Sequence, residues 1–231
     1  MQMEYEAALL SSVEVNPGVK SFRFSLHPDF VFAAGQFFRV KLSDNMVKHF
    51  SFSNSPTEGG YMEFTTRMTG SEYKNVLDKL KAGDKVLVSG PYGNFTYDPV
   101  LSKIAFLSGG IGITPIRSIC RYVTDRGMKS DIFLFYGSEQ ENGILFKKDF
   151  EEMAKRNKGL RVVHVLNNPT SQWNGYKGFI TRDIILREMP DFRERTFYIC
   201  GSPGMVGAMT SMLGELGVGK DRIRLESFTG Y

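Results

Sequence analysis

Two different rhythms of apolar and polar residues divide the chain. In residues 1–98 apolar and polar positions alternate, as in Phe22, Phe24 and Leu26 against Arg23 and Ser25, and this period of two is typical of half-buried strands. Six runs of this kind are expected to be strands, over residues 5–15, 20–26, 35–42, 48–54, 61–68 and 84–90. One stretch, 71–83, instead has helical spacing behind the expected N-cap Ser71. Six strands and one helix predict a small antiparallel β-barrel.

Beyond residue 102 the rhythm changes to strand, helix, strand, helix. Short buried runs are each followed by a longer stretch with helical spacing; the runs are 103–107, 131–137, 160–166 and 196–201, and a last expected strand, 222–228, closes the chain. This alternation predicts a doubly wound α/β domain, in which helices cover both faces of a parallel sheet. We therefore expect two domains, residues 1–98 and 99–231, with the boundary at the interruption around Pro99.

Composition and charge narrow the class of protein. The chain has 231 residues, of which 42% are hydrophobic, and it contains no apolar run near the roughly 20 residues of a membrane helix. It also lacks a secretory signal pattern, so we expect a cytoplasmic protein. The formal net charge of +4 is dispersed, which disfavours nucleic acid as a partner but suits an acidic protein partner. Two cysteines and three histidines show no metal-ligand spacing, so no metal centre is expected.

The stretch SGGIGITP, residues 108–115, follows the first expected strand of the α/β half. Its glycines, Gly109, Gly110 and Gly112, would let the backbone approach a phosphate at the start of the next helix. Thr114 is expected to cap that helix, and Pro115 suits its first turn. From this stretch alone, a nucleotide site and a plain strand-to-helix turn are equally good interpretations.

A second turn of the same kind favours the nucleotide. Cys200 and Gly201 end a later strand, and Pro203 opens the helix behind it. Ligands of doubly wound sheets bind beyond the carboxyl ends of the strands. Two such turns on one sheet are therefore expected to hold one extended ligand.

Five segments, in order, resemble the ferredoxin–NADP reductase superfamily, in which a flavin-binding barrel precedes a pyridine-nucleotide domain. The segments are HFSFSNSP (49–56), RMTGSEYKNVL (67–77), GPYGNF (90–95), SGGIGITP (108–115) and YICGSPGMV (198–206). The C-terminal ESF, 226–228, also matches the family's acid-x-aromatic ending. The resemblance covers essentially the whole chain. It implies an NAD(P)H-dependent oxidoreductase with FAD, which passes single electrons to ferredoxin or flavodoxin.

For the barrel half, the resemblance implies contacts with the flavin. Phe50 would lie against the isoalloxazine, and Ser51 would place a hydroxyl near flavin N5. Phe52 and Ser53 are expected to alternate outward and inward along the same strand. The other residues expected at the flavin are Lys48, His49, Thr65, Thr66, Arg67, Gly70, Ser71 and Lys74. Of these, Thr65, Thr66 and Arg67 are expected along its pyrimidine edge, and Gly70 and Ser71 at its pyrophosphate.

For the α/β half, the resemblance implies the reacting site. Cys200 and Glu226 would flank the nicotinamide, and Phe228 would cover the flavin until the nicotinamide displaces it. With Ser51 these are the expected catalytic residues, and Tyr231 is the second choice for the stacking ring. The expected nucleotide contacts are Gly109, Gly110, Gly112, Thr114, Pro115, Ser138, Glu139, Cys200, Gly201, Pro203 and Met205.

Some residues depart from the family pattern. Lys48 and Phe50 replace an arginine and a tyrosine, which removes a bidentate fork and a phenol. Lys74, where the family often has serine, is either a second cation near the pyrophosphate or a solvated helix residue. We predict FAD as the cofactor, with FMN as the alternative.

The nucleotide and the electron acceptor stay open. Glu139 and Glu141 disfavour a 2′-phosphate, whereas Ser138, Lys147 and Lys148 favour one, and the balance tips slightly to NADH. The alternatives to a ferredoxin or flavodoxin reductase are a flavin reductase or an oxygenase reductase component. A non-catalytic nucleotide-binding partner protein is the alternative from a different class.

Overall fold

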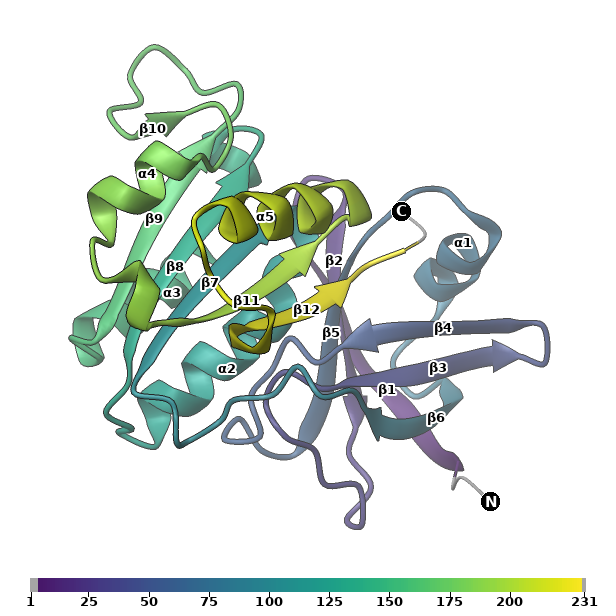
Figure 1. Cartoon of the computed structure of the whole chain (residues 1–231). Helices are drawn as coiled ribbons and strands as arrows, with labels where there is room; N and C mark the ends of the chain where they lie inside the picture. The colour runs from purple at the N-terminus through teal and green to yellow at the C-terminus, as the bar shows by residue number, and fades with distance from the viewer. Residues whose placement is uncertain (1–3, 230–231) are drawn as a thin grey trace.

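Residues 4–229 are described by the structure, a computed structural model in which two sheets meet side by side (Figure 1). The first sheet is antiparallel and has six strands in the order β4-β3-β6-β1-β2-β5. Its strands are β1 (Glu4–Asn16), β2 (Val19–Ser25), β3 (Phe37–Ser43), β4 (Met46–Ser51), β5 (Tyr61–Arg67) and β6 (Lys85–Tyr92). The antiparallel architecture expected for this half is confirmed.

Aromatic side chains fill the inside of this sheet. The fully buried rings are those of Phe22, Phe24, Phe38, Phe52 and Phe64, and burying each contributes about 1.5–3 kcal/mol. The two edge strands approach each other where the backbone N–H of Ser53, just after β4, donates to the carbonyl of Glu63 in β5 at 2.8 Å. One backbone hydrogen bond therefore links the two edges of the curled sheet.

Helix α1 (Glu72–Lys79) packs on the first sheet, as its apolar spacing predicts. Ser71 is its N-cap residue, although the serine side chain makes no capping hydrogen bond. Tyr73 and Leu77 are buried beneath it, and the Tyr73 hydroxyl donates to the Val40 carbonyl at 3.0 Å. These contacts hold the helix against β3.

The second sheet is parallel throughout, in the order β10-β9-β8-β7-β11-β12. Its strands are β7 (Lys103–Gly109), β8 (Asp131–Ser138), β9 (Leu160–Leu166), β10 (Tyr176–Lys177), β11 (Thr196–Gly201) and β12 (Ile223–Ser227). The helices are α2 (Ile113–Asp125), α3 (Lys147–Arg156), α4 (Arg182–Glu188) and α5 (Pro203–Glu215). Two separate apolar cores, one on each face, show that helices cover both sides. This confirms the doubly wound arrangement; only the short β10 was not expected.

The strand order reverses between β7 and β11, and both glycine turns lie at the carboxyl ends of these two strands. A 3-10 turn, Gly110–Gly112, leads from β7 into α2. The N-cap of α2 is Gly112, so the expectation that Thr114 caps the helix is wrong. Thr114 already lies inside the first turn, and its hydroxyl donates to the Ile111 carbonyl at 3.2 Å. None of the helices within residues 4–229 is long and apolar enough to cross a membrane.

Candidate functional site

The two glycine turns touch each other through their backbones. A Cβ placed on Gly112 would lie 2.4 Å from the Cys200 carbonyl oxygen and 2.8 Å from the Gly201 Cα. The Met205 sulfur packs on both turns, because a Cβ on Gly109 or on Gly201 would lie 2.5 or 2.8 Å from it. Glycine is therefore required at Gly112, where a side chain would meet backbone atoms, and the two turns form one continuous surface.

The acid-x-aromatic ending lies beside the second turn. Glu226 on β12 is directly opposite Cys200 on β11, and the Phe228 N–H donates to the Gly201 carbonyl at 3.0 Å. Cys200 is fully buried; burial and then the Glu226 carboxylate raise the pKa of its thiol. Burial also raises the pKa of Glu226. The site therefore holds a neutral thiol and a carboxyl group that keeps its proton to a higher pH than an exposed glutamate.

Strand β4, which carries the residues expected at the flavin from Lys48 to Ser51, approaches the same point. Ser51, 6% exposed, pairs with Phe37 in the β3–β4 ladder. A Cβ on Gly93 would lie 2.9 Å from the Phe37 ring and 4.0 Å from Glu226 Oε2. Gly93 thus leaves room where the end of β4 and the end of β12 converge, although they are far apart in sequence.

Phe50 lies between an aromatic ring and a cation. Its ring stacks on Phe64 with a centroid separation of 4.0 Å, and the Lys74 ammonium lies 4.4 Å from the Phe50 centroid. Lys74 also donates to the Thr66 hydroxyl. Burial, and then the charge of Lys48, lower the pKa of Lys74 to about 8. Within residues 4–229, neither Lys48 nor Lys74 forms a salt bridge with a carboxylate.

Several residues expected at the flavin have other surroundings. Phe52 and Ser53 follow the end of β4 at Ser51, and both side chains are fully buried. Phe52 lies in the aromatic core and stacks on Phe32 with centroids 3.8 Å apart, whereas the Ser53 hydroxyl donates to Glu63 at 2.9 Å. Because Glu63 alternates along β5 with the core residues Met62 and Phe64, Phe52 and Ser53 point to opposite sides of the sheet, with Phe52 on the inner side.

The other barrel residues are distributed over two sides of the strands. The Thr65 hydroxyl lies 2.6 Å from that of Ser21, on the side of the sheet opposite the aromatic core. His49 is largely exposed, and its ring lies edge-on to the Phe37 ring with centroids 5.6 Å apart. Partial burial of the imidazole, and then the charges of Arg39 and Lys48, lower the pKa of His49. Gly70, with φ of +73°, precedes α1 at the end where Lys74 lies.

Comparison with known proteins identifies the family. A model described as an oxidoreductase FAD-binding domain matches residues 6–97, and one described as an oxidoreductase NAD-binding domain matches residues 106–211. NADH-cytochrome b5 reductase 1 of Dictyostelium discoideum is 31% identical over 219 residues, which cover 90% of this chain and 77% of that protein. This chain belongs to the ferredoxin–NADP reductase superfamily. It is a flavoprotein oxidoreductase with an FAD-binding and an NAD-binding domain.

Other relatives of this reductase differ in length. One component of the Na⁺-translocating NADH-quinone reductase of Shewanella denitrificans is 30% identical over 212 residues, which cover 84% of this chain but only 52% of that component. The cytochrome P450 reductase of Amycolatopsis has the same fold, with a TM-score of 0.87 at 24% identity over 100% of this chain and 72% of that one. A ferredoxin–NADP⁺ reductase from Neisseria gonorrhoeae, solved with FAD and NADP, has a TM-score of 0.83 at 18% identity, covering 97% and 98% of the two chains.

The residues of this reductase fit the two cofactors. Lys48 and Lys74 are two neighbouring cations without a carboxylate partner in the described chain, which is the charge that a pyrophosphate requires. In the glycine turn between β7 and α2, Gly110 has φ of +54° and carries no side chain, so a phosphate can approach its backbone. The two lysines and the glycine turn thus lie in different halves of the reductase.

Arg67 lies close to the first glycine turn. A Cβ on Gly110 would lie 3.2 Å from an Arg67 guanidinium nitrogen, so this exposed barrel residue extends to the α/β half, and its expected place at the flavin edge stays a prediction. The Tyr136 hydroxyl donates to the Gly110 carbonyl at 3.0 Å from below the turn. Sequence reasoning missed Tyr136, which looks like an ordinary core residue of β8.

A polar cradle that the sequence did not indicate surrounds Glu139, next to Ser138 at the end of β8. The carboxylate accepts hydrogen bonds from Asn168 and, at 3.2 Å, from Asn167, both of which follow β9. Glu141 accepts a hydrogen bond from the Thr170 hydroxyl at 2.6 Å.

Two other expected residues remain to be placed. Pro203 is the first residue of α5, as expected, directly after the N-cap Ser202. Tyr231 lies outside the described residues.

Proposed function

We propose that this protein catalyses hydride transfer between NAD(P)H and FAD, with NADH preferred, and then reduces a small acidic one-electron carrier such as ferredoxin or flavodoxin. Residues 1–98 would bind FAD and residues 99–231 the nicotinamide nucleotide. The observation that carries this proposal is the convergence of Ser51, Cys200 and Glu226 around Gly93 and the two glycine turns. These residues come from both domains, so a ligand of one domain can meet a ligand of the other there.

The residues of the site divide the work. Bound FAD supplies the chemistry, since flavins accept a hydride and release its electrons singly. Ser51 would orient the flavin with its hydroxyl, while the Lys48 and Lys74 ammonium groups bind the pyrophosphate. Cys200, kept neutral by burial, would pack against the nicotinamide and exclude water. Glu226 would hold a proton beside the reacting rings.

The acceptor is proposed from charge. The net charge is +4, and Arg39, Lys48 and His49 share the β3–β4 hairpin near Ser51, which suits an acidic partner. A second candidate acceptor is a cytochrome of the b5 type, because the Dictyostelium reductase named for it is 31% identical over 90% of this chain. Steady-state reduction of ferredoxin, flavodoxin and cytochrome b5 by one preparation would rank them.

An anaerobic absorbance titration with NADH and NADPH tests the proposed function directly. Flavin absorption should bleach, and NADH should bleach it faster. Absence of flavin absorption after reconstitution with FAD and with FMN would contradict the enzyme assignment and leave the non-catalytic alternative. Extracted flavin that runs as FMN would contradict only the FAD assignment.

Glu139 should set the nucleotide preference. Its carboxylate is held in place by Asn167 and Asn168, so it repels a 2′-phosphate without moving aside. We expect Glu139→Gln to reduce the ratio of kcat/KM for NADH over NADPH about tenfold, or roughly 1.4 kcal/mol. Glu194→Gln, at the opposite end of the sheet, serves as the control. A wild-type protein that prefers NADPH would contradict this assignment.

Arg67 should act on the nucleotide rather than on the flavin. Because its guanidinium lies at Gly110, Arg67→Ala should raise the KM for NADH about 10- to 100-fold, as expected for the loss of a hydrogen bond to a charged group of about 1.5–3 kcal/mol. Flavin content should stay unchanged, and Arg67→Lys should recover part of the loss. If the flavin dissociates while KM is unaffected, Arg67 belongs to the flavin edge.

A further inference from the structure

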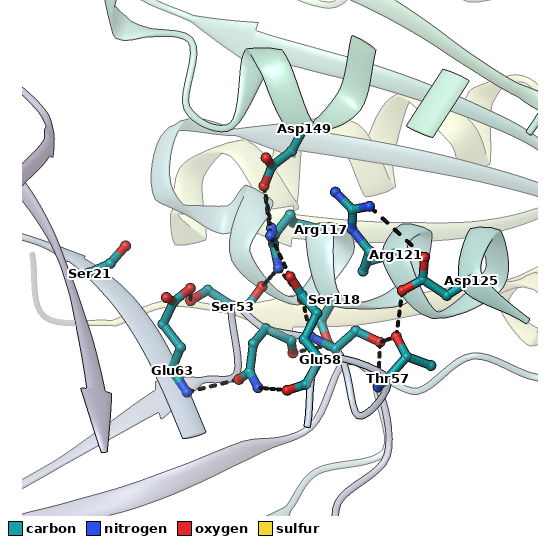
Figure 2. A network of polar contacts seen from close by, with 12 residues as sticks. Ser21, Ser53, Thr57, Glu58, Glu63, Arg117, Ser118, Arg121, Asp125 and Asp149 are labelled. Carbon is teal, nitrogen blue, oxygen red and sulfur yellow. Dashed lines mark hydrogen bonds and ion pairs between the residues drawn. The ribbon is translucent and has the colours of Figure 1, made fainter. Parts of the chain in front are cut away.

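Helix α2, which begins at the first glycine turn, also makes hydrogen bonds to the segment that follows β4. Arg117, one turn into α2 and only 7% exposed, donates to the carbonyl of Ser53 at 2.9 Å. The next residue, Ser118, donates its hydroxyl to the carbonyl of Asn54 at 2.7 Å. Two successive residues of α2 thus donate hydrogen bonds to two successive backbone carbonyls of the segment that follows Ser51. Figure 2 shows Arg117 and Ser118 facing this segment at Ser53.

The same guanidinium joins three parts of the molecule. It donates to both carboxylate oxygens of Glu58, at 2.5 and 3.0 Å, in the loop between β4 and β5. It also donates from Nε to Asp149 of α3 at 2.8 Å. Burial alone would lower the pKa of Arg117, but the hydrogen bonds and charges of Glu58 and Asp149 outweigh this effect and raise it. Arg117 is therefore a permanent cation that joins Ser53 and Glu58 of the barrel half to Asp149 of the α/β half.

The barrel side of this contact is itself held firmly. Besides its carbonyl, Ser53 uses its hydroxyl and its N–H, which donate to the side chain and the carbonyl of Glu63 at 2.9 and 2.8 Å. Arg23 donates to the same Glu63 carboxylate at 2.6 Å. Glu58 also accepts from the Ser55 N–H at 2.8 Å. Any shift of α2 against Ser53 must therefore break several hydrogen bonds at once.

We propose that Arg117 is a positioning residue, which fixes the Ser51 end of the flavin strand relative to the glycine turn that begins α2. This inference rests on the proposed function, because the turn and the strand would carry the two reacting cofactors. Hydride transfer requires the reacting atoms to be about 3–3.5 Å apart, and a misplacement of about 1 Å costs on the order of 100-fold in rate. Arg117 would act on the rate without touching either cofactor.

A matched control lies one turn further along the same helix. Arg121 is also mostly buried, and it pairs with Glu152 of α3 at 2.6 Å. Its second carboxylate, Asp125, is in α2 itself, 4.0 Å away. Asp125 also pairs with Arg156 at 3.1 Å, and it accepts a hydrogen bond from the Thr57 hydroxyl at 2.7 Å. Arg121→Ala therefore removes an ion pair within the α/β half but leaves in place the Asp125 hydrogen bond to the barrel loop.

The test compares Arg117→Ala, Arg117→Lys and Arg121→Ala as FAD-loaded proteins. We expect Arg117→Ala to keep its FAD and its affinity for NAD⁺ but to transfer hydride from NADH about 100-fold more slowly in single-turnover measurements. Arg117→Lys should lie between it and the wild type, because an ammonium reaches only one of the three partners. Arg121→Ala should transfer hydride as the wild type does, even if its melting temperature falls equally.

Hydrogen–deuterium exchange gives a readout that does not depend on turnover. NAD⁺ binding should increase protection of residues 51–58 in the wild type and in Arg121→Ala, less in Arg117→Lys, and not at all in Arg117→Ala. Wild-type hydride transfer in Arg117→Ala, or an equal loss in Arg121→Ala, would overturn the proposal. If Arg117→Ala does not fold, Arg117→Lys decides by the same two measurements. A wild type without hydride transfer would instead overturn the proposed function, and the exchange result would still decide whether Arg117 couples the domains.

Discussion

Replacing Lys48 and Lys74 together by glutamine is expected to give a folded protein that no longer retains FAD. The two ammonium groups lie near each other without a salt-bridge partner in the described chain, and Lys74 lies over the Phe50 ring. Each lost hydrogen bond to a phosphate is worth about 1.5–3 kcal/mol, so the dissociation constant should rise on the order of 10²- to 10⁴-fold. Fluorescence titration of the flavin-free protein with FAD measures this change.

The pH dependence of the same site has a defined sign. The pKa of Lys74 is lowered from 10.5 to about 8, so above pH 8 the folded, flavin-free protein binds fewer protons at this residue than the unfolded chain. Its stability should therefore rise between pH 8 and 10.5, and Lys74→Gln should abolish this rise. FAD affinity should fall over the same range, because the phosphates favour the charged ammonium.

The exposed Lys79, on the same helix, provides the control for both measurements. Lys79→Gln should leave the FAD affinity and its pH dependence unchanged. If the double variant binds FAD as tightly as the wild type does, the two lysines are solvated surface residues and the pyrophosphate lies elsewhere.

Gly112→Ala should abolish reduction by NADH while the flavin stays bound. The added Cβ would lie 2.4 Å from the Cys200 oxygen and 2.7 Å from its carbon. Both are backbone atoms, so no side chain can move aside, and the two turns must separate. Overpacking of this kind typically costs about 1–3 kcal/mol, which the two cores of this domain can absorb without unfolding.

Calorimetric titration with NAD⁺ and anaerobic stopped-flow reduction by NADH measure the effect of Gly112→Ala. Gly214→Ala is the matched control, since a Cβ there meets nothing within 4 Å and the position lies in the last turn of α5. Retained NAD⁺ affinity and a normal rate of reduction in Gly112→Ala would show that the contact between the turns does not shape the nucleotide site.

Local periodicity was sufficient to predict both sheets. The runs at 61–68 and 196–201 became β5 and β11 almost without change, because alternation or continuous burial is a property of each segment alone. The two-residue β10 escaped prediction, since only its pairing with β9 makes it a strand. Thr114 was misplaced because the 3-10 turn before α2 shifts the helix start to Ile113.

The site was predictable where neighbouring elements carry it. Cys200 and Glu226 meet because β11 and β12 pair in register, as adjacent parallel strands of a doubly wound sheet do. The contacts of Arg67 with Gly110 and of Arg117 with Ser53 were not predictable. Each joins residues of different domains, and no pattern within a segment encodes how two separately formed cores dock against each other.

The burial of both cysteines also supplies a built-in reporter of opening. Cys120 on α2 and Cys200 on β11 are fully buried, and burial raises the pKa of each thiol. Alkylating reagents attack the exposed thiolate, so the native protein should resist iodoacetamide until this domain opens. Since both thiols lie in the α/β half, their labelling rate measures the opening of that half alone, while flavin fluorescence follows the barrel. The opening of each half can thus be measured separately in one sample, without introducing a new cysteine or another label by mutation.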